Sequence, residues 1–126
     1  MKTLKVGIAS YEQMKARTMD VARGRYKPRK GDPKVWFTSI ESFARVLSDR
    51  NRGLLHLIAR TEPASLTELA MLSGRAKSNL SRTLKTMEGY GLVRLKKGGG
   101  GQIVPSVPYT DIVLDVPIAA QRERPA

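Results

Sequence analysis

The sequence contains no cysteine, one histidine and only one tryptophan in 126 residues. Without cysteine the chain has no disulfide framework, zinc knuckle or thiol nucleophile. The single histidine, His56, lies between two leucines, so we expect it to be packed or half-buried, and no second histidine exists to form a metal site or a dyad with it. The acidic residues are scattered, with no obvious acid–base pair. We therefore expect no metal, no cofactor and no enzymatic activity.

Long apolar runs are also missing. No segment is long enough to span a bilayer, and the first residues lack the hydrophobic region of a signal peptide, so we expect a cytoplasmic protein. Negative charge is scarce, because 11 Asp and Glu stand against 23 Lys and Arg and leave a formal net charge of +12. This excess favours a polyanionic partner, most often nucleic acid. An anionic membrane is less favoured, since no helix pairs a wide apolar face with a uniformly cationic one.

Residues 1–34 predict a strand, a helix and a basic linker. Apolar and polar residues alternate over 2–9, which indicates the strand. Ser10 and Gln13 have the spacing of a capping box for a helix that ends at Gly24. The basic run 23–34 holds two prolines and two glycines, so it could be a flexible arm. Whether it binds phosphates or is only a solvated linker stays open at this point.

Residues 35–107 predict four helices followed by a hairpin. Val35-Trp36-Phe37 enters the core, and Thr38 or Ser39 caps the first helix. The second helix runs over about 50–60, and two more, at 66–72 and 76–88, are separated by a break that contains glycine. Strands at 92–96 and 102–107 enclose the glycine loop 98–101. The loop is interpreted as a mobile tip, because no Lys-Ser or Lys-Thr follows it as in a nucleotide-binding loop.

The segment 76–88 predicts a helix with two distinct faces. Leu80, Leu84 and Met87 recur at helical spacing and face inward. The opposite side mixes short hydrogen-bonding groups with cations: Lys77, Ser78, Asn79, Ser81, Arg82 and Lys85. Such a mixture suits a helix that reads base edges in a major groove, although a solvated polar face would have the same composition.

Individual roles follow from the chemistry of these side chains. We assign base contacts to Ser78, Asn79 and Arg82, since Asn can pair with adenine and Arg with guanine through two hydrogen bonds. Ser81 is either a phosphate contact or helix surface. On the hairpin, the cations are Arg94, Lys96 and Lys97. They favour contact with phosphates or the minor groove over a charged strand edge that only prevents aggregation.

The same stretch carries a family resemblance. SLTELAMLSGRAKSNLSRTLKTMEGYGLVRL, residues 65–95, resembles the helix-turn-helix and first wing strand of winged-helix regulators of the MarR/ArsR type. The matching pieces are Leu69-Ala70, Ser73-Gly74, Ser81-Arg82, Leu84-Lys85, Met87-Glu88 and Gly91-Leu92-Val93. Ala76 departs from the pattern, because such proteins often have a capping Ser or Thr there. The resemblance implies a dimeric prokaryotic regulator that binds double-stranded DNA, most often as a repressor.

A second resemblance covers most of the chain. VGIASYEQMKAR, VWFTSIESFARVLSDRNRGLLHLIA and VPY are similar to small prokaryotic winged-helix regulators, some of which are antitoxins of type II toxin–antitoxin modules. This resemblance implies an alternative function, capture of a toxin protein together with control of the antitoxin's own operon. RNA binding is a third reading and is less favoured, because the major groove of A-form RNA is too deep and narrow for side chains to read.

The two ends of the chain complete the expected architecture. A strand at 109–116 is predicted, and it and the strand near the N-terminus are expected to pair within a dimer or with another protein. Residues 117–126 are expected to be a frayed tail. We thus predict an α+β protein, a winged helix-turn-helix with an N-terminal strand–helix extension and a C-terminal strand. Its expected divisions are 1–34, 35–107 and 108–126, with the wing at 92–107.

Overall fold

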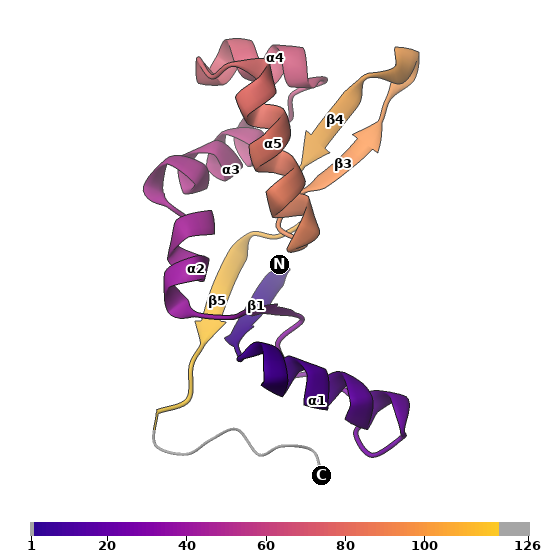
Figure 1. Ribbon diagram of the computed structural model, residues 1–126. Coiled ribbons are helices and arrows are strands. Elements are labelled where there is room, and N and C mark those ends of the chain that lie inside the picture. Colours follow the sequence, from indigo (N-terminus) through magenta and orange to yellow (C-terminus); the bar gives the residue numbers. More distant parts are fainter. Residues whose placement is uncertain (1, 119–126) are drawn as a thin grey trace. The chain divides into compact units, whose positions relative to one another are not determined.

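The computed structural model describes residues 2–118 and confirms the α+β winged helix-turn-helix architecture (Figure 1). The N-terminal strand and helix, the helical region, the hairpin and the C-terminal strand all occur in the predicted order. The elements are β1 (Thr3–Ile8), α1 (Tyr11–Ala22), β2 (Val35–Phe37), α2 (Ile40–Val46), α3 (Asp49–Thr61), α4 (Leu66–Ser73), α5 (Lys77–Gly89), β3 (Arg94–Lys97), β4 (Ile103–Ser106) and β5 (Asp111–Asp115). Residues 119–126, which include most of the expected tail, lie outside the described residues.

The contacts divide the chain into two compact units. One is the helix-turn-helix unit, residues 44–110 with the first two residues. The other is the sheet unit, formed by residues 3–43 and by the chain from 111 onward. β2 pairs with β1 and so lies in the same unit as the N-terminal segment.

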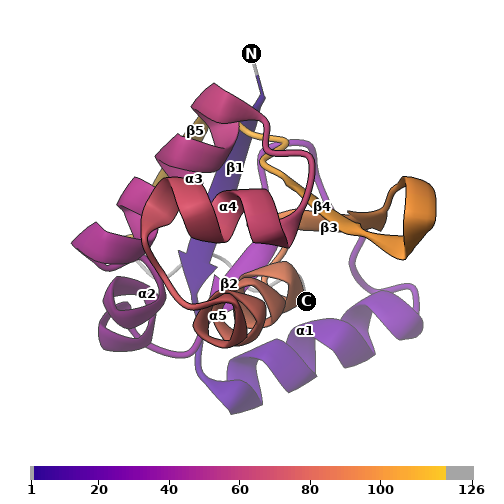
Figure 2. The same ribbon diagram turned by 90° about the horizontal axis from the view of Figure 1, so that it is seen from above.

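The helix-turn-helix unit is built around apolar side chains that its helices turn inward. Ser48 caps α3 by accepting from the N–H of Asn51, and Ser65 caps α4 by accepting from the N–H of Glu68. Figure 2 views α5 nearly end-on, with α4 lying across the view. Burying each large apolar side chain contributes about 1.5–3 kcal/mol. The buried set is Leu47, Leu54, Leu55, Ile58, Leu66, Leu69, Leu80, Leu84, Met87, Leu92 and Val93.

The wing is the antiparallel hairpin of β3 and β4, with Arg94 opposite Ser106 and Lys97 opposite Ile103. Its first strand begins two residues later than predicted. Leu92 and Val93 are buried, and the N–H of Leu92 donates to the carbonyl of Met87. These two residues therefore complete the end of α5 and the core before the chain enters the wing.

The sheet unit has the strand order β2-β1-β5, with both pairings parallel. The capping box is confirmed, because Ser10 Oγ accepts from the N–H of Gln13 while the Gln13 side chain accepts from the N–H of Ser10. Leu4 and Val6 of β1 are buried, as is Phe37 of β2. The central strand needs a glycine at position 7, because a Cβ there would lie 2.5 Å from the Trp36 ring.

The pairing of the two terminal strands corrects one expectation. We expected them to pair with each other across a dimer or with another protein. Instead β1 pairs with β5 of the same chain, with Leu4 beside Ile112 and Val6 beside Leu114. An apolar strand of this kind is stabilised only when its hydrogen-bonding edge is covered, and the partner strand here lies within the same polypeptide.

The basic segment between α1 and β2 is not the flexible arm considered above, because it folds around Asp32. The carboxylate of Asp32 accepts from the hydroxyl of Tyr26 and from the N–H of Arg29 at 2.9 Å. It also pairs with Arg17 Nη2 at 3.2 Å. Arg17 lies over two rings, with its Cζ 4.9 Å from the centroid of Tyr26 and 5.4 Å from that of Trp36.

The prediction for His56 was wrong. This residue was expected to be packed or half-buried, but it is exposed on α3. Its neighbours Leu54, Leu55 and Ile58 supply the inward face, so residue 56 falls on the outer side of the helix.

Within residues 2–118, no helix has the length and apolar character needed to cross a membrane.

Candidate nucleic-acid interface

The turn between α4 and α5 sets the direction of the helix predicted to read bases. Gly74 has φ +71°, a conformation that other L-residues adopt only with strain, and its N–H donates to the carbonyl of Ala70. Leu80, Leu84 and Met87 are fully buried along one side of α5. The opposite side of the helix is therefore directed away from the core.

The predicted site residues of α5 divide into two groups. Four are exposed and form what we call the outer face: Lys77, Ser78, Arg82 and Lys85. Ser81 and Asn79 are half-buried on the two flanks of the helix. Ser78 and Arg82 are four residues apart, so they lie one above the other on the same side of α5. The structure thus brings together four of the six residues expected from the sequence and places the other two, Ser81 and Asn79, on the flanks.

The start of α5 confirms the departure noted at Ala76. This residue is the N-cap and makes no side-chain hydrogen bond to the first turn. Ser73, at the end of α4, accepts instead from the N–H of Arg75 at 3.2 Å through its hydroxyl. The connecting turn is therefore held by a serine three residues before the expected position.

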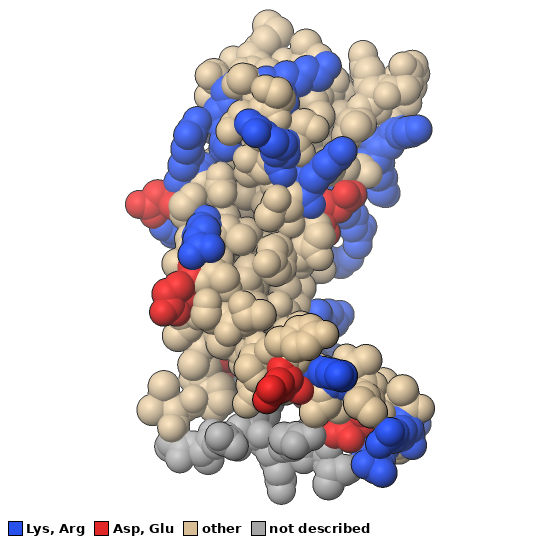
Figure 3. Space-filling view, in the orientation of Figure 1, with Lys and Arg blue, Asp and Glu red and all other residues tan. Residues whose placement is uncertain are grey.

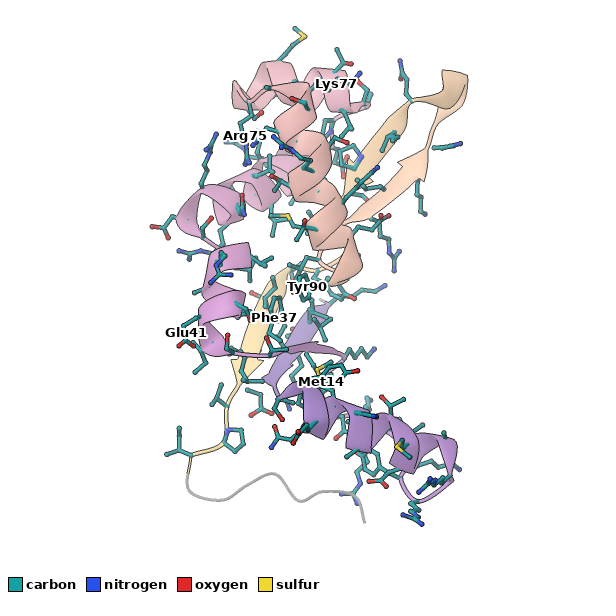
Figure 4. The ribbon with its side chains drawn as sticks, in the orientation of Figure 1. Met14, Phe37, Glu41, Arg75, Lys77 and Tyr90 are labelled. Carbon is teal, nitrogen blue, oxygen red and sulfur yellow. The ribbon has the colours of Figure 1, made fainter. Side chains whose placement is uncertain are left out.

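Arg75 is a site residue that the sequence analysis missed. Its Nε and Nη2 donate to Asn79 Oδ1 at 3.0 and 2.8 Å, and Nη2 also donates to Thr83 Oγ1 at 3.3 Å. Its Nη1 reaches Asn51 Oδ1 of α3 at 3.5 Å. Figure 4 labels Arg75 beside α5 on the side of α3 and Lys77 near the start of α5. The spacing 75, 79 and 83 was the available signal, because it repeats every four residues.

The electrostatic setting of Arg75 is unusual for an arginine. Burial lowers the pKa of its guanidinium, and the positive charge of Arg50 lowers that pKa further. Its hydrogen-bond partners are the neutral oxygens of Asn51, Asn79 and Thr83, and the ion pairs within residues 2–118 do not include it. The charge of Arg75 is therefore solvated by amides and a hydroxyl and has no carboxylate counterion in the described structure.

Asn79 has limited capacity for the base contact expected of it. Its amide oxygen accepts two N–H groups from Arg75, which occupies both lone pairs. Pairing with adenine needs that oxygen as an acceptor for the N6 amino group. In this conformation Asn79 offers only the two donors of its amide nitrogen.

On the wing, Arg94, Lys96 and Lys97 are all exposed. Successive residues of a strand point to opposite faces, so Arg94 and Lys96 share one face of β3 while Lys97 lies on the other with half-buried Leu95. The three cations predicted to contact the backbone are thus present on the wing but divided between its faces.

Positive charge dominates the helix-turn-helix unit. Its residues 44–110 contain eleven Lys and Arg against four Asp and Glu. Figure 3 shows blue side chains around α3, α5 and the wing, with few red ones among them. The ion pairs of residues 2–118 involve none of Lys77, Arg82, Lys85, Arg94, Lys96 and Lys97. Over the same residues no group of three His, Asp or Glu side chains is placed to hold a metal ion.

A protein-family model, HVO_A0114, matches residues 46–114. The match covers more than half of the chain and includes α3, α4, α5 and both strands of the wing. No curated protein matches the chain.

Proposed function

The chain belongs to the HVO_A0114 family, and we propose that it is a sequence-specific double-stranded DNA-binding protein that acts as a transcriptional repressor. The observation that carries this proposal is the outer face of α5. It presents three cations, Lys77, Arg82 and Lys85, together with the hydroxyl of Ser78. All four side chains are exposed, and the three cations form no ion pair within residues 2–118. A surface of this kind, beside a basic wing, matches the chemistry of a major groove and its flanking phosphates.

Base reading is assigned to Ser78 and Arg82. Recognition helices enter the major groove with their N-terminal part, and these two residues lie in the first two turns of α5. The guanidinium of Arg82 can donate two hydrogen bonds to O6 and N7 of guanine, and the hydroxyl of Ser78 can donate or accept. Lys77, Ser81 and Lys85 would contact phosphates on either side of the groove.

The wing would lie along the DNA backbone. Arg94 and Lys96 share a face of β3, so both can reach phosphates at the same time. Each such contact strengthens binding to DNA of any sequence, and its contribution falls as the salt concentration rises. The phosphates of duplex RNA could contact the wing in the same way. The major groove of duplex RNA is too deep and narrow for α5 to enter, so RNA is the weaker candidate ligand.

Arg82 gives the sharpest test, because lysine supplies a charge-matched control. Arg82→Lys keeps the positive charge but loses the planar fork that pairs with guanine. We expect this variant to lose about 1–3 kcal/mol of binding free energy on a duplex that the wild-type protein selects from a random library. Its binding to unselected duplexes should change little. The measurement is fluorescence anisotropy with both duplexes at one salt concentration.

Two results would count against the proposal. A wild-type protein that selects no sequence from the library would exclude sequence-specific binding. Equal losses by Arg82→Lys on selected and unselected duplexes would remove Arg82 from base reading. Duplex RNA of the same sequence serves as competitor, and its failure to displace the selected DNA is the expected outcome.

The sheet unit favours a second candidate function, capture of a toxin protein. Along α1 it has an open groove of about 420 Å³, lined mainly by apolar groups, among them Met14, Val21 and Trp36. DNA binding by the other unit does not require this surface. Loss of toxicity when the chain is co-expressed with the product of a neighbouring gene would support the antitoxin function. Unchanged toxicity would leave DNA binding as the proposed function.

We also propose a homodimer. Operators with two half-sites are usually bound by two-fold dimers. β5 lies at one edge of the three-stranded sheet and carries exposed Val113, so a second copy of the strand could extend the sheet there.

A further inference from the structure

We propose that Arg50, Arg75 and Asn79 form a clamp for a single DNA backbone phosphate, on the flank of α5 that adjoins α3. The inference rests on the proposed DNA binding and assigns Asn79 a different role from the adenine contact expected from the sequence. The clamp lies within the helix-turn-helix unit and outside the outer face of α5.

The first argument is that Asn79 has only donors left to offer. A guanidinium can donate but not accept, so its contact with Asn79 must be to the amide oxygen, and the amide nitrogen must point elsewhere. Thr83 Oγ1 likewise accepts from Arg75, which leaves its hydroxyl hydrogen free to donate. A phosphate offers only acceptors, as does the major-groove edge of guanine, whereas the adenine edge pairs an acceptor with a donor. The remaining donors of Asn79 therefore match a phosphate and do not match the adenine pairing expected from the sequence.

The second argument is electrostatic. Arg75 is half-buried and bonded to neutral oxygens, while Arg50 is close enough to repel it. Holding two cations in proximity without a counterion costs free energy, which an anion placed between them would offset. A phosphate carries that charge and suits the geometry of arginine.

The third argument is that Arg75 is already ordered. Its guanidinium is hydrogen-bonded to three side chains, those of Asn51, Asn79 and Thr83. Asn51 is itself fixed, because its Nδ2 donates to the carbonyl of Val46 at 3.0 Å and its N–H donates to Ser48 Oγ at 3.2 Å. A preorganised arginine loses little conformational freedom on binding, which favours affinity.

The first test measures how DNA affinity depends on salt. Arg50→Met and Arg75→Met should each reduce the slope of log K against log salt on a random-sequence duplex, by at most about 0.9, because both arginines share one phosphate and one phosphate contact contributes about 0.9 in total. Arg60→Met is the matched control, because Arg60 lies on the same helix about 15 Å from Arg50 along its axis, and it should leave the slope unchanged. Arg50 is exposed, so its variant reports on binding even if Arg75→Met unfolds.

The second test separates phosphate contact from base reading. Asn79→Ala should lower the affinity for the selected and for the random duplex by the same factor, about tenfold, and should not change which bases are selected. Asn79→Asp retains an acceptor for Arg75 but places a negative charge beside the phosphate, so it should weaken both duplexes more than Asn79→Ala does.

The outcomes that overturn the clamp differ from those that overturn DNA binding. If Arg50→Met keeps the wild-type slope, or if Asn79→Ala weakens only the selected duplex, the clamp is wrong while DNA binding stands. If the wild-type protein binds neither duplex, the proposed function fails and the clamp fails with it.

Discussion

Replacing Asp32 by asparagine should destabilise the sheet unit, because one carboxylate organises the whole basic segment. Asp32 accepts from Tyr26 and Arg29 and pairs with Arg17. The side chains of Asp32 and Arg17 are only 17% and 23% exposed, so water screens the pair weakly. Asparagine has the same shape but a single acceptor oxygen and no charge. Losing the charge-assisted contacts should cost about 1.5–3 kcal/mol.

The pH dependence of this effect has a defined sign. Burial alone would raise the pKa of Asp32, but hydrogen bonds from Arg29 and Tyr26, together with the charge of Arg17, bring that pKa below its usual value. A depressed folded-state pKa contributes stability that is fully present above the unfolded value of about 3.9 and is lost as pH falls through the folded value. The difference in the free energy of unfolding between wild type and Asp32→Asn should therefore be large at pH 7 and shrink below about pH 4.

The assay uses a natural probe. Trp36 is the only tryptophan in the chain and lies in β2 with its ring beside Arg17, so its fluorescence reports unfolding of the sheet unit. Urea titrations at pH 7 and pH 3 would give the free energy of unfolding for each variant. Glu41→Gln is the control, because it makes the same charge change at an exposed residue.

Either of two results would refute this reasoning. Asp32→Asn could unfold at the wild-type midpoint at pH 7, which would mean that the network contributes no net stability. Alternatively the gap could stay constant from pH 7 to pH 3, which would mean that the carboxylate charge is not the cause.

Two further predictions concern DNA and self-association. Replacing both Arg94 and Lys96 by Gln should lower the slope of log K against log salt by about 1.8, whereas Lys97→Gln, on the opposite face of β3, should change it less. If the double variant keeps the wild-type slope, the wing does not contact the DNA backbone. Val113→Lys should convert a dimer into a monomer in sedimentation, because a lysine on β5 opposes strand pairing. The control Val21→Lys on α1 should remain dimeric, and a Val113→Lys variant that stays dimeric would place the interface elsewhere.

The parts of the fold that the sequence predicted are those governed by local rules. The capping box at Ser10 and Gln13 depends on residues three apart, and the inward face of α5 depends on helical spacing. The turn at Gly74 depends on one residue type. Each of these signals lies within a few residues of the structure that it specifies, so a single sequence is enough to find it.

Most of the features that were missed depend on contacts between distant segments. The contact of Arg75 with Asn79 is the local exception: the spacing of four residues was visible, but it does not show that the guanidinium takes both lone pairs of the amide oxygen. The role of Asp32 requires Arg17, fifteen residues earlier, to fold back over two aromatic rings. The parallel pairing of β1 with β5 joins opposite ends of the chain, and alternation of apolar residues does not identify a strand's partner.

The placement of β5 has a consequence for synthesis on the ribosome. Apart from the first two residues, the helix-turn-helix unit is continuous in sequence, whereas the sheet unit is interrupted by it and is completed only by a strand that begins at residue 111. Domains fold as units while the chain emerges from the N-terminus, and contacts between distant residues form late. We therefore expect the helix-turn-helix unit to fold first in the nascent chain, while β1 keeps one edge open for chaperones or other nascent chains until β5 emerges and closes it.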